Sequence, residues 1–145
     1  MIKDFNYDWE LSKDELKEYI KHHKLNEYAD NYESLVKTLF KYVINAENTN
    51  DYERYDIDDM KVIDDGSYQG TQIFILHKDT YQPSITDYVY TSNYYGSCSG
   101  CDTLLWITGY CLDDLPNNDQ VNDLMSLFLH LLQNCEKMKN LLEEK

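Results

Sequence analysis

The feature that most constrains this chain is a regular spacing of apolar residues near its C-terminal end. The stripe alternates steps of three and four residues over three heptads and comprises Val121, Leu124, Phe128, Leu131, Cys135, Met138 and Leu142. This spacing predicts a long helix over residues 119–144, which Asn117 or Asn118 can cap. Leu127 and Leu132 widen the stripe, and a wide stripe favours packing on a sheet of the same chain. A dimer formed through this helix is the alternative.

Two more helices are predicted in the N-terminal third of the chain. Ser12 and Glu15 have the spacing of a capping box, which predicts a helix that begins near residue 12. A second helix is predicted from near Asp30, because six apolar residues recur at helical spacing. They are Leu35, Val36, Leu39, Phe40, Val43 and Ile44. We expect this second stripe to lie in the core.

The middle of the chain has the patterns of strands. Residues 45–59 are polar and predict a loop, and residues 60–76 predict two strands around a turn. Asp65-Gly66 and Gly70 are expected to supply the positive φ angles that this connection needs. A third strand is predicted over residues 87–95, which are rich in β-branched and aromatic side chains. The expected fold is therefore α+β in a single domain, residues 1–145, with a small antiparallel sheet of about three or four strands between N-terminal helices and a long C-terminal helix.

The charge balance limits the partners that such a protein can bind. The chain has 27 Asp and Glu residues against 13 Lys and Arg residues, a formal net charge of −14. Affinity for nucleic acids depends largely on Lys and Arg contacts to phosphates, so direct binding to DNA, RNA or an anionic membrane surface is disfavoured. A basic protein is favoured as a partner, because an acidic surface attracts it.

The N-terminal sequence and the hydropathy indicate a cytoplasmic protein. The first ten residues have no basic segment followed by an apolar run, and no apolar stretch reaches the length of a membrane span. In the cytoplasm the four cysteines are expected to be reduced, so their even number does not predict disulfides.

The sequence Cys98-Ser-Gly-Cys101 is compatible with three kinds of structure. A CxxC pair between a strand and a helix is typical of thiol-disulfide oxidoreductases, although the neighbouring Asp102 disfavours a reactive thiolate. Cys98, Cys101 and Cys111 could instead bind zinc, with His77 or His130 as a fourth ligand. A structural bend of small residues is the simplest interpretation, because a single CxxC pair is a weak signal.

A dense run of carboxylates in the middle of the chain is the main candidate for a binding surface. Together with nearby tyrosines it gives the predicted partner-binding residues Asp51, Glu53, Tyr55, Asp56, Asp58, Asp59, Asp64, Asp65 and Tyr68. A nuclease could bind a divalent metal through Asp64 and Asp65, but this acidic field would repel its substrate. The run is either a solvated loop or a surface that imitates a phosphate backbone, in which tyrosines add rigid contact area.

Part of the chain resembles a known group of proteins. Residues 62–104, with the motif YGSCSGCDTL, and residues 115–132 are similar to small acidic proteins encoded by phages and prophages of low-GC Gram-positive bacteria. The resemblance covers roughly half of the chain. It implies a phage accessory protein that acts in the cytoplasm of a bacterial host cell, where such proteins often inhibit defence systems. It implies no catalytic residue.

These observations lead to one main functional hypothesis and two alternatives. The main hypothesis is a non-enzymatic protein without a cofactor or resident metal, which inhibits a basic host protein, such as a nucleic-acid-binding defence factor, through the acidic and tyrosine-bearing surface. The first alternative is a small thiol-redox or zinc protein that uses Cys98, Cys101 and Cys111. The second is an immunity-type protein that neutralises a basic toxin.

Overall fold

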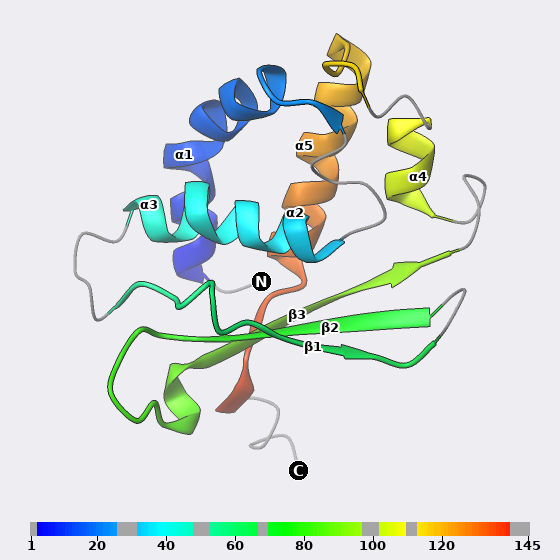
Figure 1. Cartoon of the computed structure of the whole chain (residues 1–145). Helices are drawn as coiled ribbons and strands as arrows, with labels where there is room; N and C mark the ends of the chain where they lie inside the picture. The colour runs from blue at the N-terminus through cyan, green and yellow to red at the C-terminus, as the bar shows by residue number, and fades with distance from the viewer. Residues whose placement is uncertain are drawn as a thin grey trace.

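The fold is a layer of helices packed on one face of an antiparallel sheet (Figure 1). This computed structural model describes residues 3–25, 32–47, 53–66, 70–96, 102–109 and 113–139. The predicted α+β class is confirmed, because helices from the N-terminal and C-terminal parts of the chain cover an antiparallel sheet. None of the helices described is long and apolar enough to cross a membrane.

The first helix, α1, spans Lys3–Lys21 and begins nine residues earlier than expected. Ser12 is buried in the middle of α1, so the prediction that it starts the helix was wrong. The apolar face of α1 already begins at Phe5 and continues through Trp9, Leu16 and Ile20, all of which are buried. This four-residue periodicity, rather than a capping box, determines where the helix begins.

The second predicted helix is confirmed, with a change of pitch along its length. Helix α2 spans Tyr32–Leu39, continues as the π-helical segment η2 over Phe40–Ile44, and ends in the short α3 over Asn45–Glu47. All six residues of the predicted stripe are buried. The expected loop therefore begins after Glu47 rather than at Asn45.

The sheet has four antiparallel strands in the order β1-β2-β3-β4. Strand β1 spans Lys61–Asp64, β2 Gly70–His77, β3 Tyr88–Tyr95 and β4 Glu136–Lys137. The short 3-10 helix η4, Ile85–Asp87, comes directly before β3. Gly70 does not adopt a positive φ, in contrast to our expectation. Its role is steric, because a Cβ atom there would lie 2.5 Å from Asp65 Oδ1.

The C-terminal helix is shorter than predicted. Helix α5 spans Asn118–Gln133, and Asn117 caps its start by accepting a hydrogen bond from the Gln120 amide at 2.8 Å. The expected continuation to residue 144 was wrong, because the chain leaves the helix at Asn134 and forms β4, where Lys137 pairs with Val89.

The alternative use of residues 119–144, a dimer seam along one continuous helix, is not available to this helix because α5 ends at Gln133. The apolar face of α5 packs against α1, α2 and β3 of the same chain. Six of its residues are buried there: Val121, Leu124, Leu127, Phe128, Leu131 and Leu132. The helix therefore packs within its own chain, as the wide apolar stripe predicted.

A buried polar network joins α2, α4 and the end of β3. Helix α4 spans Thr103–Thr108, and the Asp102 carboxylate directly before it is buried. The Tyr32 hydroxyl donates a hydrogen bond to Asp102 Oδ1 at 2.7 Å, and the Gly96 amide donates to Oδ2 at 2.9 Å. The Leu104 amide donates to the Tyr32 hydroxyl at 3.0 Å. Burial, together with the hydrogen bond to Asp102, raises the pKa of Tyr32.

Candidate functional site

Of the nine predicted partner-binding residues, seven lie in the part of the chain that the structure describes. Asp51 and Tyr68 lie outside it, as do Cys98, Cys101 and Cys111. The remaining seven residues do not form one continuous patch. They are divided between the core, a hollow beside α2 and η2, and the two ends of β1.

Tyr55 belongs to the core rather than to a binding surface. Only 8% of its side chain is exposed, and its ring makes edge contacts with Phe5 and Phe40 at centroid distances of 6.0 and 5.4 Å. The Asn45 side chain accepts a hydrogen bond from the Tyr55 amide at 2.8 Å and donates one to its carbonyl at 3.0 Å. Tyr55 therefore anchors the acidic loop to the helical layer.

Asp56 and Asp58 lie beside a hollow of about 570 Å³ between this loop and the helices. Three carboxylates line the hollow, those of Asp56, Asp58 and Asp79. They are matched by three cationic side chains, those of Lys37, Lys41 and Arg54. Because these charges balance, the hollow lacks the strong negative field expected of a phosphate-like surface. Glu53 is exposed in the same loop.

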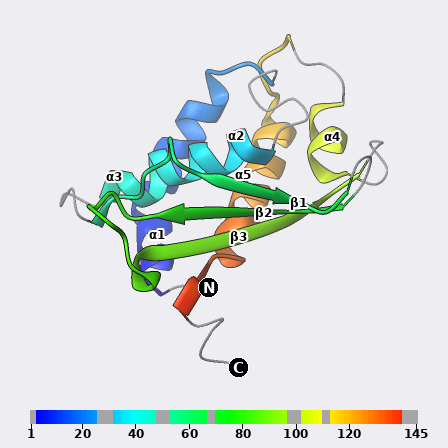
Figure 2. The same ribbon diagram turned by 60° about the horizontal axis from the view of Figure 1, so that its bottom comes forward.

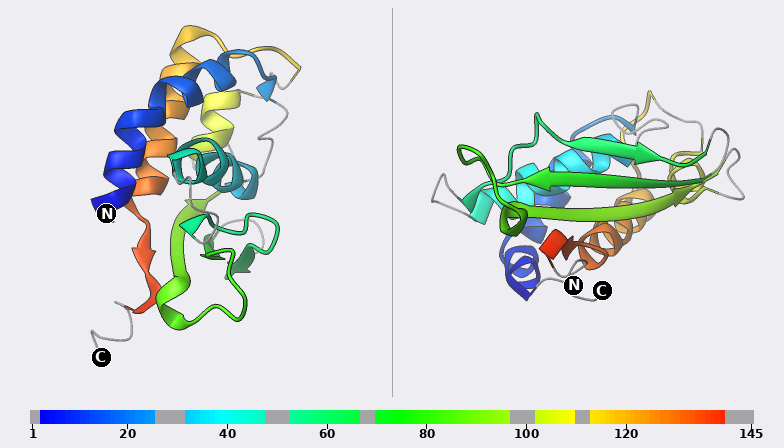
Figure 3. Two further views of the ribbon diagram at one scale, coloured as in Figure 1. Left: turned by 90° about the vertical axis from the view of Figure 1, so that its left-hand side faces the viewer. Right: turned by 90° about the horizontal axis from the view of Figure 1, so that it is seen from below.

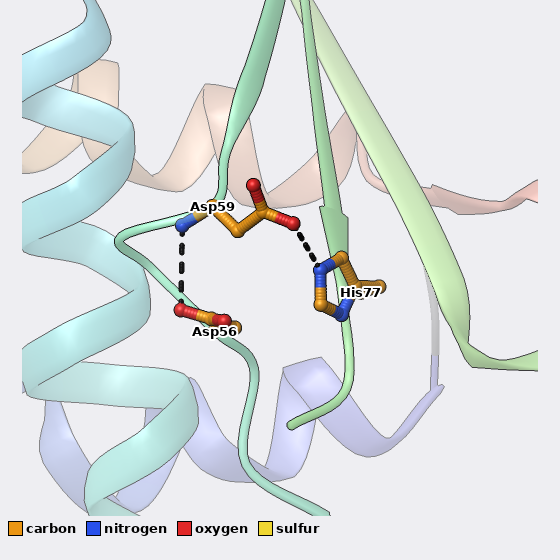
Figure 4. Close-up of side chains that lie close together, drawn as sticks. All are labelled: Asp56, Asp59 and His77. Atoms are coloured by element: carbon orange, nitrogen blue, oxygen red, sulfur yellow. Dashed lines mark hydrogen bonds and ion pairs between the residues drawn. The ribbon is translucent and has the colours of Figure 1, made fainter. Parts of the chain in front are cut away.

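Asp59 and His77 are in polar contact where the chain enters β1. Asp59 Oδ2 lies 2.8 Å from His77 Nε2 (Figure 4). Asp59 Oδ1 accepts a hydrogen bond from Lys61 Nζ at 3.0 Å. The hydrogen bonds from His77 and Lys61 lower the pKa of Asp59. Partial burial acts to lower the pKa of His77, but its hydrogen bonds to Lys78 and Asp59 outweigh this effect and raise it.

Asp64 and Asp65, at the other end of β1, do not converge on one point. The Asp64 carboxylate accepts hydrogen bonds from the Tyr95 hydroxyl at 2.6 Å, from the Gly66 amide at 2.9 Å and from Gln72 Nε2 at 3.1 Å. Asp65 Oδ1 instead accepts from the Thr71 amide at 2.7 Å. Successive residues of an extended strand point to opposite faces, so these carboxylates do not form the metal pair that a nuclease would need.

The hydrogen bond between Tyr95 and Asp64 affects the pKa of both groups. It is the main reason that the pKa of Asp64 is lowered, with the Gly66 amide as the next cause. The same bond raises the pKa of the Tyr95 hydroxyl to about 12. This pair stabilises the end of the β1–β2 hairpin against β3.

The face of the sheet that points away from the helices is uncovered by the described parts of the chain (Figures 2 and 3). Phe74 and Leu76 of β2 are fully buried under the helices. Ile73 and Ile75 alternate with them along the strand and therefore point to the opposite side of the sheet. Directly paired residues share a face, and the register therefore assigns the neighbours. We call this set the open face: Asp59, Lys61, Ile63, Asp65, Thr71, Ile73, Ile75, His77, Tyr88, Tyr90, Ser92, Tyr94 and Glu136.

The centre of the open face is apolar and aromatic, and its β1 edge ends in carboxylates. Ile63 is 53% exposed and Tyr94 is 52% exposed. Asp59 and Asp65 lie at the two ends of the β1 row, separated by more than about 10 Å because each strand residue rises about 3.3 Å. The two carboxylates are part of the acidic run predicted from the sequence. The isoleucines and tyrosines between them were missed, although their alternation along residues 71–77 and 88–94 marks them as one face.

The remaining cysteine, Cys135, is a core residue. Its side chain is fully buried and its thiol donates a hydrogen bond to the Leu131 carbonyl at 3.5 Å. Burial raises the pKa of this thiol to about 12, which makes it unreactive at neutral pH.

Comparison of the chain with models of protein families, with curated proteins and with solved structures found no match.

Proposed function

We propose that this protein is a non-enzymatic phage accessory protein that binds and inhibits a basic host protein through the open face. One observation carries the proposal: a sheet face with isoleucines and tyrosines at its centre and carboxylates along one edge is left uncovered by the helices. The resemblance of residues 62–104 to phage-encoded proteins supports a partner in a bacterial host.

The composition of the open face supports a protein partner rather than a nucleic acid. Three tyrosines, Tyr88, Tyr90 and Tyr94, lie beside exposed or partly exposed isoleucines, and aromatic residues of this kind dominate binding energy at protein interfaces. Lys61 is the one lysine or arginine that the face contributes from β1, β2 and β3, so phosphate contacts are few. The net charge of −14 favours a partner of opposite sign and a fast association that depends on salt.

The proposal changes the expected binding surface in one respect. The acidic residues around Asp56 and Asp58 face a hollow with balancing cations, so they contribute less than the sequence suggested. Asp59 and Asp65 keep the role of steering charges, whereas Ile63 and Tyr94, which are about half exposed, take over the role of main contacts. Each main contact is expected to contribute about 2 kcal/mol or more to binding, as hot-spot residues do.

Capture from a host lysate with matched variants tests this function. Ile63→Ser and Tyr94→Ser change the open face, while Leu11→Ser and Tyr7→Ser change equally exposed side chains of α1, at 51% and 66% exposure. We expect a basic protein from a low-GC Gram-positive lysate to be retained by the wild type and by the α1 variants, and lost by the open-face variants. Its release should increase with salt concentration. Retention by the open-face variants and loss by the α1 variants would refute the proposed surface.

A further inference from the structure

Three side chains with metal-binding atoms meet where the loop before β1 approaches the end of β2. One oxygen each of Asp56 and Asp59 and a ring nitrogen of His77 all lie within 4.8 Å of one another (Figure 4). Only 13% of the His77 side chain is exposed, whereas Asp59 is open to solvent on one side. The cluster combines imidazole and carboxylate donors, a set that suits first-row transition metals.

The backbone fixes the positions of these three residues. The Asp56 amide donates a hydrogen bond to the His77 carbonyl at 2.9 Å, and Tyr55 forms an antiparallel bridge with Lys78. One oxygen of Asp56 accepts from the amides of Asp58 and Asp59 at 3.1 and 3.3 Å. These hydrogen bonds hold the two carboxylates of the loop against the end of β2, so that an ion would not need to order the chain when it binds.

The hydrogen bonds of His77 indicate which of its nitrogens would bind a metal. Nδ1 lies 2.8 Å from the Lys78 carbonyl oxygen, which can only accept, so Nδ1 carries a hydrogen. Nε2 faces the Asp59 carboxylate at 2.8 Å. Because this carboxylate also can only accept, Nε2 donates to it as long as no metal is bound. A metal ion would replace the Nε2 proton, which is released to water, and would bind the lone pair that the proton leaves. Metal-binding histidines typically donate their other N–H to a backbone carbonyl in the same way.

We propose that Asp56, Asp59 and His77 bind one divalent transition-metal ion, such as Mn²⁺ or Zn²⁺. The 2.8 Å between Nε2 and Oδ2 of Asp59 is close to the separation of about 3 Å between neighbouring ligands that each lie about 2.1 Å from an octahedral ion. Two carboxylates neutralise the charge of the ion, and Lys61 occupies the other oxygen of Asp59, which leaves Oδ2 for the metal. The exposed side of Asp59 admits water to the remaining positions.

The test measures binding of Mn²⁺ and Zn²⁺ to the full chain by titration calorimetry. Because Cys98, Cys101 and Cys111 could also bind zinc, the measurements use both the wild type and a background in which these three are serine. His77→Gln and Asp59→Asn each remove one ligand. Asp58→Asn is the matched control. It removes one negative charge, as Asp59→Asn does, from the adjacent residue of the same turn, but the Asp58 carboxylate lies outside the cluster. Circular dichroism verifies that each variant is folded.

The proposal expects one ion per chain in both the wild type and the serine background. Affinity should fall by about tenfold or more in His77→Gln and in Asp59→Asn, since even groups that only orient a ligand change metal affinity by about 10–100-fold. Asp58→Asn should retain the affinity. Saturating Zn²⁺ should also displace the Nε2 proton of His77 and alter the Nε2 resonance in nitrogen NMR spectra.

Three results would overturn the proposal. The ion would bind elsewhere if His77→Gln and Asp59→Asn had the same affinity as the protein without these substitutions. Loss of binding in the serine background alone would assign the ion to the thiols. The weakest protein cation sites bind at about 1 mM free ion. If no stoichiometric binding occurs up to that concentration, His77 and Asp59 form only an imidazolium–carboxylate pair. None of these results depends on the proposed protein partner.

Discussion

The buried network around Asp102 gives a stability prediction that can be worked out from its geometry. Tyr32→Phe removes one hydroxyl that both donates to Asp102 at 2.7 Å and accepts from the Leu104 amide at 3.0 Å. A hydrogen bond to a charged group contributes about 1.5–3 kcal/mol, and leaving a buried amide without a partner costs about 1–3 kcal/mol. The two effects overlap in one group, so we expect the free energy of unfolding to fall by about 3 kcal/mol.

This loss is large enough to measure by thermal or urea unfolding. A change of about 3 kcal/mol lowers the melting temperature by roughly 10 °C in a chain of this size. The control is Tyr81→Phe, because 91% of the Tyr81 side chain is exposed and the same hydroxyl removal there should change stability by less than about 0.5 kcal/mol. If the free energy of unfolding of Tyr32→Phe is within about 0.5 kcal/mol of the wild-type value, the network does not connect α2 to α4 as described.

Three further predictions concern caps and titrating groups. Asn117→Ala should lower the free energy of unfolding by about 1 kcal/mol in urea titrations, because it removes the cap of α5. Cys135 should resist alkylation in the folded protein at pH 8 and react only on unfolding, as mass spectrometry can show, because its pKa is raised to about 12. Tyr95→Phe should raise the pKa of Asp64, measured by carboxyl NMR, towards its ordinary value. A lowered carboxyl pKa stabilises the fold above its unfolded pKa, so the stability gap between Tyr95→Phe and the wild type should be present at neutral pH and close as pH falls through the folded pKa of Asp64.

Local patterns predicted those elements whose sequence periodicity agrees with their tertiary environment. The stripe from Leu35 to Ile44 and the alternation in β2 and β3 mark buried faces directly, so the second helix and the hairpin could be identified from sequence. The start of α1 was also encoded, in the spacing of Phe5 and Trp9, but the capping box at Ser12 was a misleading local signal.

The end of α5 shows where local patterns fail. Cys135 and Met138 continue the helical period, yet the chain leaves the helix after Gln133 and pairs with β3. This pairing satisfies backbone groups of the β3 edge that no local signal near residue 134 reveals. The choice between one more helical turn and a strand is thus made by tertiary structure.

The candidate sites depended even more on long-range register. His77 meets Asp59 across a separation of 18 residues, because the β1–β2 hairpin sets which residues lie opposite. A shift of one residue in that register would move Ile63 and Asp59 to the other face of the sheet. Sequence composition could identify the acidic run. It could not predict which of its carboxylates lie on which face of the sheet and which line the hollow beside α2 and η2.

The most direct test of the central claim is side-chain oxidation footprinting of the free protein and of its complex with the captured host partner. Hydroxyl radicals oxidise exposed side chains, and Ile63, Tyr94, Leu11 and Tyr7 are all at least half exposed in the free chain. The account predicts that binding protects Ile63 and Tyr94 on the open face and leaves Leu11 and Tyr7 on α1 oxidised as before. Protection of Leu11 and Tyr7, with Ile63 and Tyr94 unchanged, would contradict it.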